Sequence, residues 1–127
     1  MNERLRILVI DDDESVRTTA AAILEVEGYE VDTAENGKEA IENSNTDLYR
    51  VALIDFRLPD MDGTELLTAL RETTPKMAKI MVTGYPTVQN AIECVNKHAD
   101  AYFVKPVDYE KLLNTIRELI QKQEKET

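Results

Sequence analysis

The chain has 127 residues, the length of one ordinary domain, and its hydrophobic fraction of 43% is normal for a chain that folds around a core. Its 25 Asp and Glu against 15 Lys and Arg leave a formal net charge of -10, which argues against nucleic acid or an anionic membrane as a direct partner. A single Cys excludes an internal disulfide or a zinc cluster, and no apolar run approaches the roughly 20 residues of a membrane span, so we expect a cytoplasmic protein.

Five short apolar runs recur along the chain and predict five strands. They are residues 5–10, 30–34, 50–54, 79–82 and 101–104. The first, third and fourth runs are nearly continuous in Ile, Leu, Val, Met and Ala, which is typical of parallel strands covered on both faces. The second run alternates with polar residues and therefore indicates an edge strand.

Apolar residues at helical spacing predict one helix after each strand. These segments are residues 16–24, with Gly28 as the stop, and then 37–46, 64–72, 88–95 and 112–120. This alternation predicts an α/β fold, a doubly wound five-stranded parallel sheet with five helices on both faces. We assign residues 1–121 to this domain and interpret residues 122–127 as a polar tail or the start of a linker.

Acidic residues stand at the ends of two predicted strands. Asp11 and Asp12 directly follow the first strand, and Asp55 directly follows the third. The functional crevice of such a sheet lies at the carboxyl ends of its strands, and neighbouring strands are only about 4.8 Å apart. A helix cap explains one or two of these acids, but the repulsion among three buried carboxylates indicates a hard divalent cation, for which Mg²⁺ is suited.

Two further strand ends contribute polar groups of other kinds. Thr83 ends the fourth strand, and Lys105-Pro106 ends the fifth. An X–Pro bond tolerates the cis form, which would aim the Lys105 side chain across the crevice. Together, one divalent cation and Lys105 balance three carboxylates, so that the site can accept a phosphoryl group. If Asp11 and Asp12 hold the metal, Asp55 is the carboxylate left to form an acyl phosphate.

Four segments resemble the receiver domain of two-component response regulators. They are Ile-Leu-Val-Ile-Asp-Asp at 7–12, Asp-Phe-Arg-Leu-Pro-Asp-Met-Asp-Gly at 55–63, Met-Val-Thr-Gly at 81–84 and Tyr-Phe-Val-Lys-Pro at 102–106. The resemblance runs from about Leu5 to Leu119 and implies the strand order 2-1-3-4-5. It also implies that Asp55 is the phospho-acceptor, that Asp12 binds Mg²⁺ directly and that Asp11 acts largely through a metal-bound water.

The same resemblance assigns the remaining site residues. The backbone carbonyl of Arg57 would be a further metal ligand, and Mn²⁺ would substitute for Mg²⁺. Thr83 and Lys105 would each contact a phosphoryl oxygen. Tyr102 would be the switch aromatic, whose ring turns inward when Thr83 moves.

The function that the resemblance implies is a signalling switch. The domain would take a phosphoryl group from a sensor histidine kinase or a histidine phosphotransfer protein. It would be no enzyme beyond its own phosphotransfer and autodephosphorylation. Phosphorylation would alter residues 87–96, 101–104 and 108–120, a surface suited to a homodimer or to an output protein. The sequence does not identify the effector domain or output protein.

Several positions depart from the family pattern or need their own interpretation. His98 stands where the family usually has Gly at the end of the fourth helix, so we expect a positive φ or a different helix end. Asp13 is interpreted as an outward helix cap, and Cys94 as a packed side chain. Arg57 and Tyr85 stand two residues past the acceptor and the switch Thr, at positions that in the family influence water access, and their bulk predicts slow loss of the phosphoryl group.

Two other functions compete with this one. A Mg²⁺-dependent phosphohydrolase of the haloacid-dehalogenase type would use Asp11 as nucleophile, with Thr83 and Lys105 as later motifs. That reading leaves Asp55 and Leu58-Pro59 unexplained, and no acidic pair follows Lys105. A receiver-like module that binds partners without phosphorylation is opposed by the complete set of predicted site residues.

Overall fold

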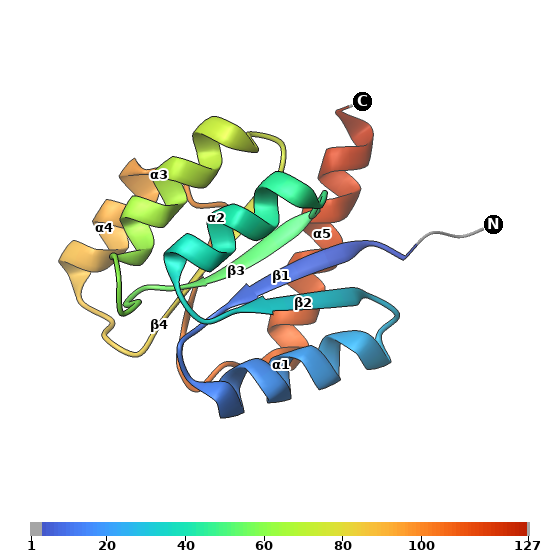
Figure 1. Cartoon of the computed structure of the whole chain (residues 1–127), viewed down its shortest axis with the longest axis horizontal. Coiled ribbons are helices and arrows are strands. Elements are labelled where there is room, and N and C mark those ends of the chain that lie inside the picture. Colours follow the sequence, from blue (N-terminus) through green and yellow to red (C-terminus); the bar gives the residue numbers. More distant parts are fainter. Residues whose placement is uncertain (1–3, 127) are drawn as a thin grey trace.

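The computed structural model describes residues 4–126, in which five strands alternate with five helices (Figure 1). The strands are β1 (Arg6–Ile10), β2 (Glu30–Ala34), β3 (Val51–Asp55), β4 (Ala78–Thr83) and β5 (Ala101–Val104). All four neighbouring pairs are parallel, in the order β2-β1-β3-β4-β5. The predicted fold class, strand order and edge position of β2 are therefore confirmed. Residues 1–3 and 127, which the predicted domain ranges include, lie outside the described part.

Helices cover both faces of the sheet (Figure 1). They are α1 (Glu14–Val26), α2 (Gly37–Thr46), α3 (Gly63–Thr73), α4 (Val88–Asn96) and α5 (Tyr109–Lys125). Side chains alternate along each inner strand, so that Leu8 and Ile54 pack with α2, α3 and α4. Ile7 and Leu53 pack with α1 and α5 on the other face. The inner strands are thus buried on both sides, as their continuous apolar runs predicted.

Local signals account for where α1 and α4 begin or end. The Asp13 carboxylate accepts hydrogen bonds from the backbone N–H groups of Ser15 and Val16, which confirms its role as the cap of α1. Gly28 has a φ of 97° just beyond α1, where the sequence predicted a stop. His98 has a φ of 65° beyond α4, so the expected left-handed conformation is also present.

Helix α5 is longer than predicted: the residues after Gln121, which were expected to fray, remain helical as far as Lys125. The Gln123 side chain accepts a hydrogen bond from Arg50 Nε at 2.9 Å. It also donates to the backbone carbonyls of Arg50 at 2.8 Å and Lys76 at 3.0 Å. These bonds attach the last turns of α5 to the opposite end of the sheet from the predicted site. The domain boundary after residue 121 stays a prediction.

Helix α4 is confirmed as a helix, but its apolar stripe does not face the core. Val88, Ile92 and Val95 are 78%, 54% and 72% exposed, respectively. Cys94 is the one residue of α4 that is buried, which confirms the prediction that its thiol is packed. Val104, at the end of β5, is exposed as well. An apolar surface is therefore left uncovered on the α4–β5 side of the domain.

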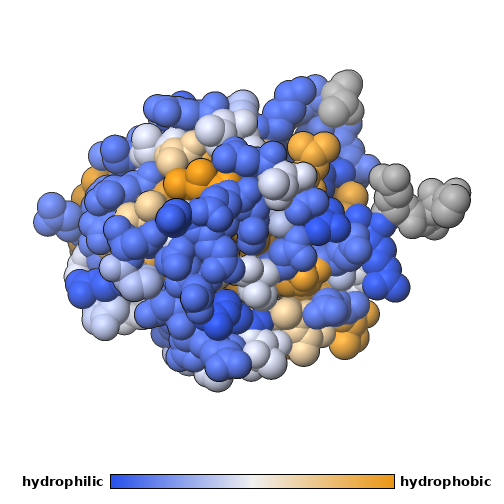
Figure 2. Space-filling model, in the orientation of Figure 1, coloured by the Kyte–Doolittle hydropathy of each residue, from blue (hydrophilic) through white to orange (hydrophobic). Residues whose placement is uncertain are grey.

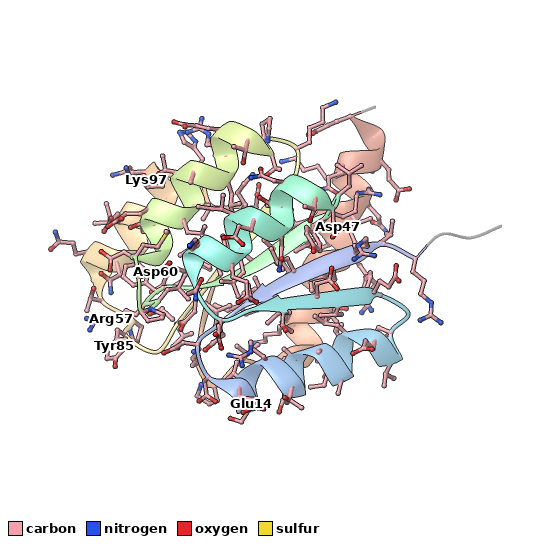
Figure 3. The ribbon with its side chains drawn as sticks, in the orientation of Figure 1. Glu14, Asp47, Arg57, Asp60, Tyr85 and Lys97 are labelled. Atoms are coloured by element: carbon pink, nitrogen blue, oxygen red, sulfur yellow. The ribbon has the colours of Figure 1, made fainter. Side chains whose placement is uncertain are left out.

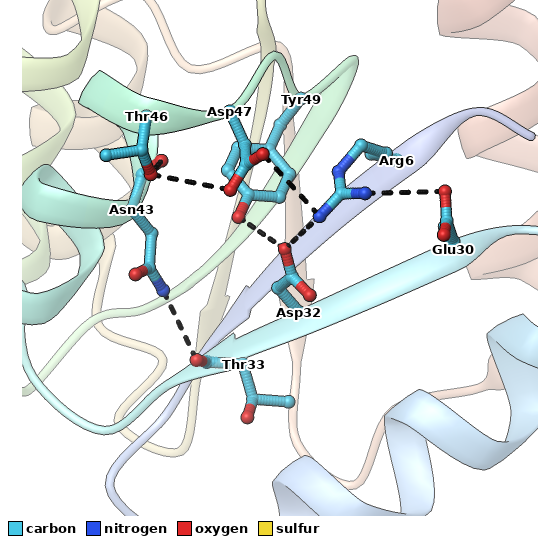
Figure 4. A network of polar contacts seen from close by, with 8 residues as sticks. All are labelled: Arg6, Glu30, Asp32, Thr33, Asn43, Thr46, Asp47 and Tyr49. Atoms are coloured by element: carbon cyan, nitrogen blue, oxygen red, sulfur yellow. Dashed lines mark hydrogen bonds and ion pairs between the residues drawn. The ribbon is translucent and has the colours of Figure 1, made fainter.

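A polar network ties the beginnings of β1, β2 and β3 together (Figure 4). The Arg6 guanidinium donates to Asp32, whose carboxylate also accepts a hydrogen bond from the Tyr49 hydroxyl at 2.6 Å. Arg6 pairs with Glu30 at 3.4 Å and stacks over the Tyr49 ring. Burial, followed by the hydrogen bond to Asp32, raises the pKa of Tyr49. This network lies at the amino-terminal ends of the strands and is structural.

The surface of the domain is mainly polar. Figure 2 shows a mostly hydrophilic face with small, separate hydrophobic areas. Within residues 4–126, no helix combines the length and the apolar character that crossing a membrane requires.

Candidate functional site

Three carboxylates converge at the carboxyl edge of the sheet. Asp11 and Asp12 follow β1, and Asp55 is the last residue of β3. β1 and β3 pair with Ile10 opposite Ile54, which brings Asp11 level with Asp55. One ligand oxygen from each of the three residues lies within 4.8 Å of the other two. Asp11 and Asp55 are buried, whereas Asp12 is exposed, so the cluster opens to solvent on one side.

Lys105 reaches into this cluster from the end of β5. Its Nζ lies 2.8 Å from Asp11 Oδ2 and 3.3 Å from Asp55 Oδ1. Although burial opposes its charge, the hydrogen bond to Asp11 and the negative charges of the two carboxylates raise the pKa of Lys105. The Lys105–Pro106 peptide bond is cis. The site therefore holds one firmly charged ammonium among three acids.

The electrostatics of Asp55 favour a further positive charge. Burial, followed by the charge of Asp11, raises the pKa of Asp55 to about 6, even though Lys105 opposes the shift. A divalent cation would relieve this repulsion, and carboxylate oxygens are the ligands that hard cations prefer. The donor set of the site thus fits Mg²⁺ or Mn²⁺.

Thr83 and Tyr102 stand on β4 and β5, the two strands that follow β3 in the sheet. Thr83, at the end of β4, is fully buried, and its Oγ1 accepts a hydrogen bond from the backbone N–H of Tyr85 at 2.9 Å. Tyr102 on β5 is partly buried against the core that α2, α3 and α4 cover. Its hydroxyl is buried and has no hydrogen-bond partner within residues 4–126. The ring already points inward, and its coupling to movement of Thr83 stays a prediction.

Arg57 lies in the loop between β3 and α3. Its backbone forms an isolated bridge with Asp62, and its guanidinium stacks on the ring of Tyr85 (Figure 3). This conformation gives the loop a defined shape next to Asp55. Coordination of a metal by the Arg57 carbonyl remains a prediction.

Gly63 brings α3 directly against the end of β3. Its backbone N–H donates to the Phe56 carbonyl at 2.6 Å. A Cβ on Gly63 would lie 2.8 Å from Phe56 Cα and would also overlap the backbone carbonyl of Asp55. Only Gly allows this approach, which fixes the start of the loop that carries Arg57.

One residue that contacts the site was not predicted. The Arg17 guanidinium donates to the backbone carbonyl of Asp11 at 2.9 Å and lies 3.9 Å from the carboxylate of Glu35. Arg17 stands one helical turn after the cap residue Asp13. An Arg at that spacing, close to two strand-end acids, is the signal that could have identified it.

Comparisons with known proteins agree with this geometry. The family model described as response regulator receiver domain matches residues 7–117. A response regulator receiver domain protein (CheY-like) from Methanospirillum hungatei JF-1 is 43% identical and has a TM-score of 0.95, with 98% of this chain and 100% of that chain covered. The beryllofluoride-activated NtrC4 receiver domain dimer is 34% identical, with a TM-score of 0.88 and coverage of 93% and 98%.

Longer curated proteins are similar over the same region. The transcriptional regulatory protein ZraR of Klebsiella oxytoca is 36% identical over 93% of this chain, which spans only 27% of that protein. The response regulator MprA of Mycolicibacterium vanbaalenii is 32% identical over 93% of this chain and 51% of its own length. A converging acidic cluster, a Lys directly after the fifth strand and the matched family model lead to one conclusion: the chain belongs to the response regulator receiver domain family, a family of signalling domains rather than conventional enzymes.

Proposed function

We propose that Asp55 accepts a phosphoryl group from a phosphohistidine on a sensor histidine kinase or a histidine phosphotransfer protein. The observation that carries this proposal is the position of Asp55, in a three-carboxylate cluster and 3.3 Å from the Lys105 ammonium. Membership of the receiver family supports it, because phosphoryl acceptance is the general function of these domains. Transfer from such a donor takes place inside the cell, so the proposal includes a cytoplasmic location for the domain.

The transfer replaces one phosphorus bond by another. A carboxylate oxygen of Asp55 attacks the phosphorus, and the phosphorus–nitrogen bond of the donor breaks, with the electron pair returning to the imidazole. The Lys105 ammonium faces negative charge that develops on the phosphoryl oxygens, and the Thr83 hydroxyl offers a further hydrogen bond. The Thr83 hydroxyl accepts from the backbone N–H of Tyr85, and its own proton stays free to be donated to a phosphoryl oxygen. A shift of Thr83 on phosphorylation is part of the proposal.

A divalent cation would be held by Asp12, Asp11, Asp55 and the backbone carbonyl of Arg57. When bound, Mg²⁺ or Mn²⁺ neutralises charge on the carboxylates and on the transferred group. Asp12 is the exposed member of the cluster. Within residues 4–126, its carboxylate accepts no hydrogen bond that would compete with a metal ion. Its availability supports the role of a direct ligand.

The contacts of Asp11 favour Asp55 as the acceptor. Asp11 Oδ1 accepts from the backbone N–H of Asp13 at 2.9 Å, and Asp11 Oδ2 accepts from Lys105 at 2.8 Å. Both oxygens are thus engaged, whereas Asp55 has the longer contact to Lys105. This difference weighs against a phosphohydrolase of the haloacid-dehalogenase type, in which Asp11 would be the nucleophile.

The output surface would comprise α4, β5 and α5. Its exposed apolar residues, among them Val88, Ile92 and Val104, suit a homodimer or the binding of an output partner. The NtrC4 receiver forms a dimer in its beryllofluoride-activated state, which supports the first of these. Because this chain spans a small part of relatives such as ZraR, an output domain or output protein remains to be identified.

Asp55→Asn tests the proposal. Acetyl phosphate with Mg²⁺ should add one phosphoryl group to the wild-type chain, detected by intact mass, and none to Asp55→Asn. Asp11→Asn is the matched control, because this variant keeps Asp55 and should still be phosphorylated, although more slowly than the wild type. Uptake by Asp55→Asn and none by Asp11→Asn would favour the phosphohydrolase. A wild-type chain that takes up no phosphoryl group would favour a module that binds without phosphorylation.

A further inference from the structure

The carboxylate of Asp60 bridges from the β3–α3 loop to the first turn of α2. Asp60 Oδ1 accepts from the backbone N–H of Gly37, and Oδ2 accepts from that of Lys38, each at 2.9 Å. The next amide, that of Glu39, is bound by the cap residue Asn36 at 2.8 Å. Asp60 lies beside the beginning of α2 in Figure 3. One carboxylate from a distant loop thus satisfies two amides that the helix itself leaves free.

The packing of Met61 strengthens this connection. A Cβ on Gly37 would overlap the Met61 side chain, so the loop rests directly on the α2 backbone. Within the loop, the N–H of Leu58 donates to the Met61 carbonyl at 3.2 Å, and Arg57 bridges to Asp62. The segment from Arg57 to Asp62 is therefore a closed turn that is attached to α2 at its tip.

We infer that Asp60 is a positioning residue for the metal site, because it anchors to α2 the turn that presents the Arg57 carbonyl. The inference rests on the proposed function, in which that carbonyl is a metal ligand. Partners that orient a metal ligand typically affect affinity even though they do not touch the ion. A turn released from α2 would sample conformations in which the carbonyl points elsewhere.

The ionised form of Asp60 makes this anchor. Hydrogen bonds from the Gly37 and Lys38 amides lower the pKa of Asp60, so the carboxylate is the form that binds both N–H groups. Asn in its place would retain one acceptor oxygen and turn an N–H₂ group toward the second amide. Asp60→Asn should therefore retain part of the anchor, and Asp60→Ala none.

Isothermal titration of the chain with Mg²⁺ alone measures the effect. Asp60→Ala should raise the Kd for Mg²⁺ by roughly tenfold, the lower end of what the loss of a ligand's partner costs, with Asp60→Asn in between. Asp62→Ala is the matched control. It removes the same charge from the same turn, yet the Asp62 side chain is exposed and makes no capping hydrogen bond. Equal increases in Kd for the two Ala variants would mean that loss of a negative charge from the turn explains the weaker Mg²⁺ binding. That result would overturn the inference.

A second control separates positioning of the turn from stability of α2. Asn36→Ala removes the neighbouring cap of α2 but leaves the Asp60 contacts in place. It should lower the thermal midpoint and leave the Kd for Mg²⁺ nearly unchanged. Amide hydrogen exchange at Gly37 and Lys38 should quicken most in Asp60→Ala. An Asn36→Ala variant that weakens Mg²⁺ binding as much as Asp60→Ala would overturn the role of Asp60.

Failure of this inference is distinguishable from failure of the proposed function. A wild-type chain that binds no Mg²⁺ contradicts the metal site itself and the inference with it. A wild-type chain that binds Mg²⁺ and is phosphorylated, while Asp60→Ala and Asp60→Asn bind as tightly, contradicts only the role of Asp60. If Asp60→Ala does not fold, the comparison of Asp60→Asn with Asp62→Asn gives the same decision.

Discussion

The guanidinium carbon of Arg57 lies 4.1 Å from the centroid of the Tyr85 ring. The two residues belong to different loops, one following Asp55 on β3 and the other following Thr83 on β4. A cation–π contact at an exposed site contributes roughly 0.5–1 kcal/mol, so the loops are joined but remain separable. The labelled side chains lie together at the same end of the molecule in Figure 3. Arg57 and Tyr85 each stand two residues past a strand-end residue of the site, Asp55 and Thr83, so the pair lies next to the carboxyl ends of β3 and β4.

The first prediction concerns loss of the phosphoryl group. Tyr85→Ala and Arg57→Ala should each shorten the lifetime of the phosphorylated chain several-fold, because they open a path for water. Tyr85→Phe keeps the aromatic ring and should leave the lifetime close to that of the wild type. Intact mass followed over time after removal of the donor provides the measurement. Hydrolysis of the wild type within seconds would contradict the slow loss that these bulky residues predict.

The second prediction uses the titration of Asp55. Its pKa is raised to about 6 in the folded chain, so the folded state binds this proton more tightly than the unfolded state. The contribution of Asp55 to the free energy of unfolding therefore falls as the pH rises from about 4 to about 6. Asn does not titrate. Asp55→Asn should thus be more stable than the wild type by about 1–3 kcal/mol near pH 7.5 without divalent cations.

Urea unfolding at two pH values checks the sign. The advantage of Asp55→Asn should shrink as the pH falls to about 4.5 and vanish only below about pH 3.9, where the wild-type carboxyl is protonated in both the folded and the unfolded chain. Added Mg²⁺ should stabilise the wild type more than Asp55→Asn at neutral pH. A stability difference that does not change with pH would show that ionisation of Asp55 is not its cause.

The third prediction compares two glycines beside the site. Gly63→Ala should lower the free energy of unfolding by about 2 kcal/mol or more, since its Cβ meets backbone atoms of β3 that cannot move aside. Gly84→Ala is the control, because the nearest atom to its Cβ is Lys105 Cδ at an unstrained 3.9 Å. Chemical denaturation of both variants gives the comparison. Equal losses would mean that the close approach of α3 to β3 is not the cause.

The fourth prediction addresses the uncovered surface of α4. With beryllofluoride and Mg²⁺ we expect a homodimer, and Ile92→Glu should abolish it by placing a charge in the apolar contact. Glu93→Gln, on the neighbouring position of the same helix, is the control and should dimerise normally. Sedimentation velocity reports both states. An activated wild type that stays monomeric would favour an output partner as the occupant of this surface.

The location of the site was predictable because it follows from topology. Asp11 and Asp55 end strands that the alternating pattern makes parallel neighbours, so their convergence needs no tertiary detail. Periodicity likewise predicted that residues 88–95 form a helix. It did not predict that Val88 and Ile92 face outward, because a periodic stripe does not reveal which elements cover it.

The missed features depend on contacts between distant parts of the chain. Gln123 bonds to Arg50 across 73 residues, and Asp60 bonds to Gly37 across 23. Neither residue belongs to an apolar pattern, and each is polar in a segment where polar side chains are usually solvated. The prediction from local propensity therefore placed the end of α5 too early, and it gave no sign that Asp60 contacts α2.

Helix α4 buries a single side chain, whereas α3 buries five of its residues. Each large apolar side chain that a helix withdraws from the core costs roughly 1.5–3 kcal/mol, so displacement of α4 costs less than displacement of α3, which buries three leucines. The few kcal/mol available from new contacts to a phosphoryl group would suffice to relocate α4 while the core under α2 and α3 stays closed. The amides of α4 should accordingly exchange with solvent through small local openings, at free energies well below that of global unfolding.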